Sequence, residues 1–151
     1  MAGNIRRTHG DLRLLLTCNT PTGRAAAAPA FDEVRYAPLD RAAVVRKVLD
    51  RVRPSLYVFV EAEIWPVLLM EMHRTRVPTA MVNARVSERS FARYRFAGGL
   101  IRRALGGVAR VCARDEESAG RLIALGARRD CLLYTSPSPR DQRGSRMPSS
   151  A

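Results

Sequence analysis

The chain has 151 residues, of which 46% are hydrophobic, so it is long enough for one domain with a buried core. It carries 26 lysines and arginines against 14 aspartates and glutamates, a net charge of +12, and all 26 except Lys47 are arginines. This excess favours anionic partners such as phosphates, nucleic acids or a membrane surface, although GC-rich codons alone also raise the arginine content. The three cysteines lack CxxC spacing and no apolar run approaches the roughly 20 residues of a membrane span, so neither a disulfide framework nor a span is predicted.

Short apolar runs typical of strands alternate along the chain with helical patterns. The expected strands are residues 12–17, 33–38, 55–61, 78–83 and 108–113. The expected helices are residues 24–31, 39–54, 64–76, 87–105 and 115–127. Asp40 is expected to cap the helix that follows it, Pro66 fits only a first helical turn, and Gly126 is expected to end the last helix. The helix over residues 87–105 is interrupted by Gly98 and Gly99.

This alternation predicts an α/β fold, a Rossmann-like parallel sheet with flanking helices. The run over residues 55–61 is apolar on both faces, as expected of a parallel strand covered on two sides. Ligands of such sheets bind outside the carboxyl ends of the strands. That edge would hold residues 17–23, 61–63, 83–85 and 114–116.

Two acids lie at the end of the third expected strand and just beyond it, in the stretch VFVEAEIWP over residues 58–66. Glu61 and Glu63 alternate along the chain, so they point to opposite faces unless the backbone turns between them. One of them is then a candidate catalytic acid, and the other is a candidate substrate ligand or a cap of the next helix.

Other polar residues are expected at the same edge. The turn that holds Thr20 and Thr22 is either an anion-binding turn or an ordinary capping turn. Asn83 and Arg85 end the fourth strand, where Arg85 is available either to a phosphate or sugar acid or to a structural ion pair. Neither His9 nor His73 has a partner at metal-ligand spacing, so no metal site and no cofactor are predicted.

The arginine-rich stretch 85–103 mixes basic and aromatic residues, among them Arg89, Arg93, Phe91 and Phe96. Such a mixture suits an anionic bilayer surface, with nucleic-acid binding or a plain solvated face as the alternatives. From residue 131 the sequence has no periodicity and is rich in serine and proline. Residues 131–151 are therefore expected to form a disordered tail, and they resemble translated sequencing-adapter DNA rather than native protein.

Taken in order, the motifs TCNTPTG, YAPLD, VFVEAEIWP, VPTAMVNARVSERS and RLIALGA resemble the amino-terminal half of the Kdo transferases. These enzymes move 3-deoxy-D-manno-octulosonic acid (Kdo) from CMP-Kdo to lipid A, at the cytoplasmic face of the bacterial inner membrane. The resemblance covers residues 5–130 and implies the acceptor-side amino-terminal domain of a two-domain GT-B glycosyltransferase. It assigns Glu61 to transition-state stabilisation. It implies CMP-Kdo, lipid A and the inner-membrane surface as partners, with no nucleic acid and no metal.

The chain also departs from that family. The Ser-Val-Gly-Glu stretch with the family's general base does not precede Asp11, and the lysine-bearing segment expected after Ala127 is replaced by the tail. The resemblance therefore predicts an incomplete domain over residues 1–130 that is inactive by itself. Two alternatives stay open: a non-catalytic basic module that binds nucleic acid or anionic membrane, and a GT-B glycosyltransferase with another sugar donor.

Overall fold

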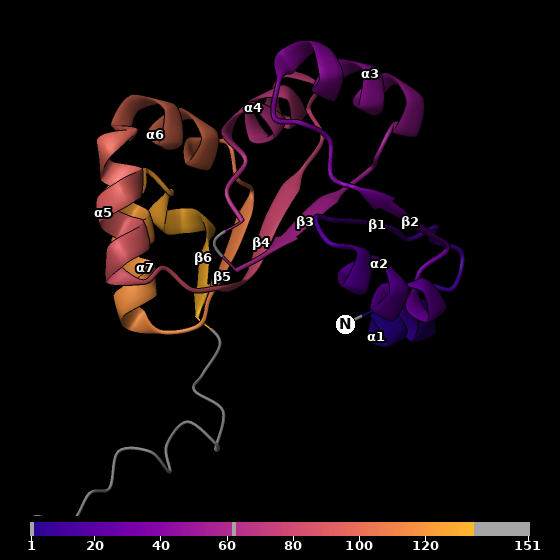
Figure 1. The fold of residues 1–151 in the computed structure, drawn as a ribbon. Helices are drawn as coiled ribbons and strands as arrows, with labels where there is room; N and C mark the ends of the chain where they lie inside the picture. Colours follow the sequence, from indigo (N-terminus) through magenta and orange to yellow (C-terminus); the bar gives the residue numbers. More distant parts are fainter. Residues whose placement is uncertain (1, 62, 135–151) are drawn as a thin grey trace, which may run out of the picture. The chain divides into compact units, whose positions relative to one another are not determined.

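The computed structural model describes residues 2–61 and 63–134. The chain divides into two compact units, Met1–Leu39 and Asp40–Ala151. Both units are built from helices and parallel strands (Figure 1).

The first unit holds a small parallel sheet, in which Leu15 of one strand lies opposite Glu33 of the other. Its elements are α1 (Ala2–Thr8), β1 (Leu15–Cys18), α2 (Pro21–Ala27), the 3-10 turn η1 (Ala28–Ala30) and β2 (Glu33–Tyr36). The carboxylate of Asp32 connects these elements. It accepts a hydrogen bond from the Leu14 amide at 2.7 Å and another from Arg6 at 2.9 Å.

The second unit is a four-stranded parallel sheet in the order β3-β4-β5-β6, with helices between successive strands (Figure 1). Its elements are α3 (Ala42–Val52), β3 (Tyr57–Val60), α4 (Pro66–Arg74), β4 (Thr79–Ala84), α5 (Glu88–Phe96), α6 (Gly98–Gly106), β5 (Arg110–Ala113), α7 (Glu116–Leu125), the 3-10 turn η2 (Arg129–Cys131) and β6 (Leu132–Tyr134). Because every neighbouring pair is parallel, the carboxyl ends of all four strands meet at one edge.

The predicted α/β class with parallel strands and flanking helices is confirmed, and all five expected strands form. The single expected sheet is wrong, because the strands pair into separate sheets of two and four. The interrupted helix appears as α5 and α6, with Ala97 between them. The strand β6 pairs with β5, so the expected tail starts no earlier than residue 135. Residues 135–151 lie outside the described part of the chain.

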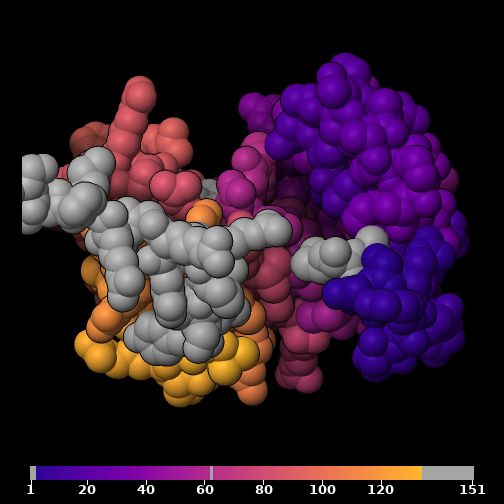
Figure 2. Space-filling model, turned by 90° about the horizontal axis from the view of Figure 1, so that it is seen from below, coloured from indigo at the N-terminus to yellow at the C-terminus, as the bar shows by residue number. Residues whose placement is uncertain are grey.

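One face of the four-stranded sheet forms the main core of the second unit. Phe59, Met81 and Val111 occupy matched positions on neighbouring strands, and all three are buried. Leu105 of α6 and Leu122 of α7 pack against them with no exposed surface. In the space-filling view the orange and yellow residues of this unit lie next to one another where grey atoms do not cover them (Figure 2). No helix within residues 2–61 and 63–134 is both long and apolar enough to cross a bilayer.

A buried carboxylate joins α3 to α4. Glu71 is only 6% exposed, and its oxygens accept hydrogen bonds from Arg46 at 2.8 and 3.0 Å and from Arg74 at 2.6 Å. These two guanidinium groups, that of Arg46 first, lower the pKa of Glu71 below its ordinary value of 4.5. The ionised carboxylate is therefore the form that the fold stabilises.

The ion pairs of Glu71 with Arg46 and Arg74 predict that the stability of the protein depends on pH. Because its pKa is lower in the folded state than in the unfolded state, the stabilisation is complete above pH 4.5 and is lost as the pH falls below it. Glu71→Gln is expected to cost about 1–2 kcal/mol at pH 7 and to flatten the loss of stability in acid. Urea denaturation between pH 3 and 7 measures both effects. Glu117→Gln, at an exposed ion pair with Arg121, is the control and should change neither by more than about 0.5 kcal/mol. An unchanged acid limb in Glu71→Gln would contradict the assignment.

Candidate active site

Glu61 follows β3 directly at the carboxyl edge of the four-stranded sheet. Its amide donates a hydrogen bond to the Val82 carbonyl at 3.0 Å, which extends the pairing of β3 with β4 by one residue. Its backbone has φ 58°, in the left-handed region that a glutamate rarely adopts. The chain therefore turns sharply at Glu61, and the exposed carboxylate stays at the strand end.

Asn83 occupies the matching place on the neighbouring strand. Val60 pairs with Val82, so Glu61 and Asn83 are the next residues on adjacent strands, and Asn83 also has a left-handed backbone with φ 50°. The pairing of β4 with β5 shifts register between Met81 and Ala84, which is where Asn83 lies. Such conformations cost about 1–3 kcal/mol each and gather at functional sites. Two of them side by side single out this edge.

The remaining non-glycine residues with positive φ in the described chain are Arg53 and Arg76. Arg53 is the C-terminal cap of α3, and Arg76 follows the end of α4 by two residues. Left-handed residues are ordinary at helix ends. They therefore carry no functional signal, in contrast to Glu61 and Asn83.

Glu63 lies beyond the turn, and its carboxylate accepts a hydrogen bond from the indole N–H of Trp65 at 3.1 Å. The second acid therefore orients the tryptophan and does not cap α4. Burial, with smaller contributions from the charges of Glu63 and Asp40, raises the pKa of Tyr57 to about 12. Tyr57 thus stays protonated beside these acids at any physiological pH.

The cap of α4 comes from a distant residue. Both oxygens of Asp40 accept hydrogen bonds from the first turn of α4, from the Val67 amide at 3.1 Å and the Leu68 amide at 2.8 Å. Asp40 was expected to cap the helix that follows it, but that helix starts after Arg41 without a side-chain cap. The carboxylate instead fixes the start of α4, and with it the connection that begins at Glu61.

Arg85 precedes Val86, whose backbone amide and carbonyl both form hydrogen bonds with α7. The Val86 amide donates to the buried Ser118 hydroxyl at 3.2 Å, and the Val86 carbonyl accepts from Arg121 at 2.7 Å. Arg85 itself is exposed, and its charge is one of those that lower the pKa of Asp115, after the larger effect of the Ser118 backbone hydrogen bond. The guanidinium is thus presented at the edge by a rigid support.

The predicted threonine turn lies in the first unit and forms a helix cap. The Thr20 hydroxyl accepts a hydrogen bond from the Gly23 amide at 3.0 Å, which is the capping alternative from the sequence. Thr22 is exposed in the first turn of α2, a helix of seven residues. Both threonines belong to the first unit, whereas Glu61 belongs to the second.

The basic and aromatic residues of α5 divide between two environments. Phe96 is 97% exposed, and Arg89 and Arg93 are exposed as well. Phe91 is instead half-buried: it packs against the core and leaves only part of its ring exposed. The guanidinium of Arg95 lies 5.7 Å from the centre of the Phe91 ring. The outer surface of α5 is thus basic with one fully exposed aromatic ring.

The sequence matches a known protein family over most of its length. The model of a family described as 3-deoxy-D-manno-octulosonic-acid transferase (Kdo transferase) matches residues 1–137. The chain belongs to the Kdo transferase family. Members of this family are GT-B glycosyltransferases that act in lipopolysaccharide biosynthesis, which agrees with the observed parallel α/β fold.

Three relatives illustrate the match. The 3-deoxy-D-manno-octulosonic acid transferase of Bordetella pertussis is 35% identical over 77% of this chain and 29% of its own length. That of Haemophilus influenzae is 28% identical over 87% of the chain and 31% of its own length. A bifunctional glycosyltransferase/methyltransferase of Fusobacterium nucleatum is 29% identical over 76% and 19%. The chain thus spans less than a third of the length of each of these three relatives.

Sequence reasoning missed the residues that support the edge. Asp40 was visible as a cap, but nothing in the sequence indicates that it acts 27 residues away, on α4. Ser118 and Arg121 belong to a helix whose start and end were predicted, yet their bonds to Val86 depend on how α7 lies against β4. Such contacts between distant segments have no local sequence signal.

Replacing Asp40 with alanine is expected to destabilise the protein by about 1–2 kcal/mol, because two amides of the α4 terminus lose a charged acceptor. The only tryptophan of the chain, Trp65, adjoins this terminus and should change its fluorescence maximum in the same variant. Asp50→Ala removes an exposed acid from α3 and should leave both readouts nearly unchanged. Equal stability of the two variants would show that the Asp40 cap contributes little.

Proposed function

We propose that the protein transfers Kdo from CMP-Kdo to lipid A, and that this chain supplies the acceptor-side domain with Glu61 as the carboxylate that stabilises the transition state. The observation that best supports this proposal is the left-handed turn at Glu61 beside Asn83, at the carboxyl ends of adjacent parallel strands of a Kdo transferase domain. Ligands of open parallel sheets bind at that edge.

The chemistry suits an acid in this place. A lipid A hydroxyl oxygen forms a bond to the anomeric carbon of Kdo, while the bond from that carbon to the CMP phosphate oxygen breaks and CMP leaves with the electron pair. Positive charge develops on the sugar ring as that bond lengthens, and the fixed Glu61 carboxylate stabilises it. The hydroxyl proton passes to a base.

The neighbouring residues take binding roles in this proposal. The exposed side chains of Asn83 and Glu63 are available to sugar hydroxyl groups, and Glu63 keeps acceptor capacity beyond its bond to Trp65. Arg85 is placed to pair with a phosphate or a sugar carboxylate. Thr20 and Thr22 receive no role, since the Thr20 hydroxyl already caps α2.

The exposed surface of α5 supports a membrane contact. We propose that Arg89, Arg93 and Phe96 face the anionic cytoplasmic leaflet of the inner membrane, where lipid A is assembled. Each arginine near such a surface contributes roughly 1 kcal/mol, and an exposed aromatic ring enters the interface favourably. Phe91 is not assigned to insertion into the bilayer, because its ring packs against the core.

Binding of lipid A to this chain tests the acceptor assignment without the rest of the protein. Trp65 fluorescence is expected to change saturably when lipid A is added in detergent micelles, because Trp65 adjoins Glu63. Arg85→Gln should weaken the affinity by about tenfold or more, through loss of a charge-assisted hydrogen bond. Arg110→Gln, a change of the same kind at the start of β5, is the control. No response to lipid A, or equal weakening by both variants, would contradict an acceptor site at this edge.

A further inference from the structure

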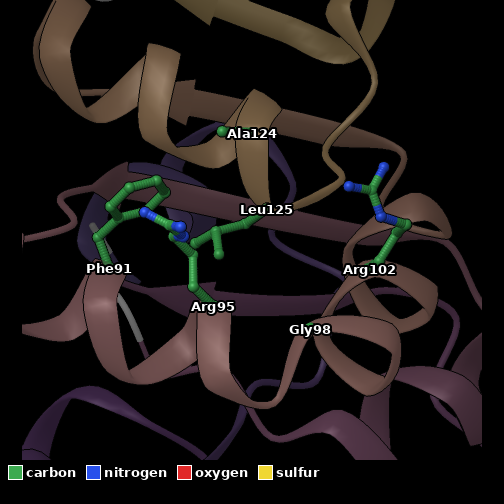
Figure 3. Close-up of a pocket in the computed structure, with 6 residues that line it drawn as sticks. All are labelled: Phe91, Arg95, Gly98, Arg102, Ala124 and Leu125. Carbon is green, nitrogen blue, oxygen red and sulfur yellow. The ribbon is translucent and has the colours of Figure 1, made fainter.

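A hollow of about 420 Å³ opens between α5, α6 and α7 (Figure 3). Its lining consists of Phe91, Arg95, Gly98, Arg102, Ala124 and Leu125. Figure 3 shows Arg95 lying by the Phe91 ring of α5, Leu125 reaching toward them from α7, and Arg102 extending from α6 on the other side. The size lies within the usual range of sites for small molecules.

Two guanidinium groups line this hollow, and the structure shows no acid that neutralises them. Within residues 2–61 and 63–134, no carboxylate forms a salt bridge with Arg95 or Arg102. Arg95 rests on the Phe91 ring, 5.7 Å from its centre, which holds the guanidinium at the wall while its N–H donors stay available. Guanidinium groups on two walls of one hollow offer N–H donors that match the oxygens of a phosphate.

The remaining lining is apolar. Leu125 is buried and Phe91 is half-buried, so the walls between the two arginines present hydrocarbon. Next to the hollow, the corner between α5 and α6 carries Phe96, which is 97% exposed, and Leu100, which is 46% exposed. A free inorganic anion makes no use of such surroundings. A ligand that joins a phosphate to apolar chains uses both parts.

We propose that this hollow binds the phosphate headgroup of an anionic phospholipid, with Arg95 and Arg102 donating to its oxygens while Phe91 and Leu125 contact the glycerol and the first acyl carbons. The inference rests on the proposed membrane contact of α5 and deepens it: the surface does not only adsorb to negative charge but holds one lipid in a defined place. Phe96 and Leu100 enter the bilayer beside that lipid.

Matched arginine variants separate a site from general charge. Sedimentation with vesicles of phosphatidylethanolamine and phosphatidylglycerol, in a ratio of seven to three, measures the affinity of the full chain. Arg93→Gln and Arg103→Gln each remove one exposed charge from α5 or α6 outside the hollow, and are expected to weaken binding about fivefold. Arg95→Gln and Arg102→Gln are expected to weaken it at least tenfold further, because hydrogen bonds to the phosphate are lost as well.

A second variant alters the wall of the hollow without changing charge. Gly98 lines the hollow, and a side chain there meets no atom within 4 Å of its first carbon, so Gly98→Leu adds an apolar group to this wall without a clash at that carbon. Monomeric dihexanoyl-phosphatidylglycerol is the probe, with inorganic phosphate beside it and amide chemical shifts as the readout. The wild type is expected to bind the lipid saturably and phosphate at least tenfold more weakly, and Gly98→Leu to lose the lipid response.

The outcomes distinguish the two proposals. Equal weakening by all four arginine variants, or an unchanged lipid response in Gly98→Leu, would overturn the lipid site while leaving the membrane contact in place. Phosphate binding as tight as that of the lipid would also overturn it. Failure of the wild type to sediment with vesicles would refute the membrane contact, and saturable binding of the monomeric lipid would still support the site in the hollow.

Discussion

Replacing Leu122 with alanine is expected to lower the free energy of unfolding by about 2–5 kcal/mol. Leu122 lies on the inner side of α7 with no exposed surface and packs within the core cluster that includes Met81, Leu105 and Val111. Removing three carbons there loses the transfer free energy of the side chain and leaves a cavity that rigid strands cannot close. Domains of this size are stable by about 5–15 kcal/mol, so the variant is expected to lie close to unfolding.

Urea denaturation at pH 7 measures this loss, with Leu56→Ala as the matched control. Leu56 precedes β3 and is 54% exposed, so the same change should cost less than about 1 kcal/mol there. A small and equal effect of both substitutions would mean that α7 does not pack against the sheet as described. Because α7 also holds Val86 by two hydrogen bonds, the Leu122 variant should in addition loosen the segment that carries Arg85.

Glu61→Gln is expected to lower the rate of Kdo transfer by about 10²–10³-fold. The amide keeps the size of the side chain but removes the negative charge that, in the proposed mechanism, stabilises the developing positive charge on the sugar. Since that charge exists only in the transition state, the loss should appear in kcat and not in KM. The assay uses a joined protein, in which the 124 aligned residues of this chain replace their counterparts in the Bordetella pertussis relative.

Glu63→Gln provides the matched control in the same joined protein. Its carboxylate accepts the Trp65 indole hydrogen bond, a task that a glutamine oxygen can also perform. The expected effect is therefore less than about tenfold and lies mainly in KM. Equal losses of kcat in both variants would show that the two acids act as a unit, and a larger loss in Glu63→Gln would reverse their roles.

Local patterns predicted most of the secondary structure, because most elements carry their own sequence signal. The apolar runs predicted five of the six strands found in the described part of the chain, and Gly126, with φ 114°, ends α7 as expected. β6 was not predicted, because it has only three residues, too few to show a periodic pattern, and precedes a serine- and proline-rich stretch. The division into two sheets was also missed, since pairing between strands depends on their relative placement and not on their composition.

The site was predictable in outline only. The rule that ligands bind at the carboxyl ends of parallel strands brought Glu61, Asn83 and Arg85 together, and within the second unit the structure places them at the ends of the adjacent strands β3 and β4. The left-handed backbone of Glu61 has no sequence signal, because a glutamate rarely adopts it, whereas asparagine adopts it more readily and Asn83 gives only a weak signal. Phe91 was predicted to lie on the surface because it stands among arginines in the sequence. In the structure its ring packs against the core.

The most direct test of the proposed function is to measure transfer of labelled Kdo from CMP-Kdo to lipid A by the joined protein. We predict that label enters lipid A at a rate comparable to that of the intact Bordetella pertussis relative, and that CMP-sialic acid gives no product. The chain by itself is expected to be without activity in the same assay. A folded joined protein that leaves CMP-Kdo unchanged, while the intact relative consumes it, would contradict the assignment of this chain to Kdo transfer.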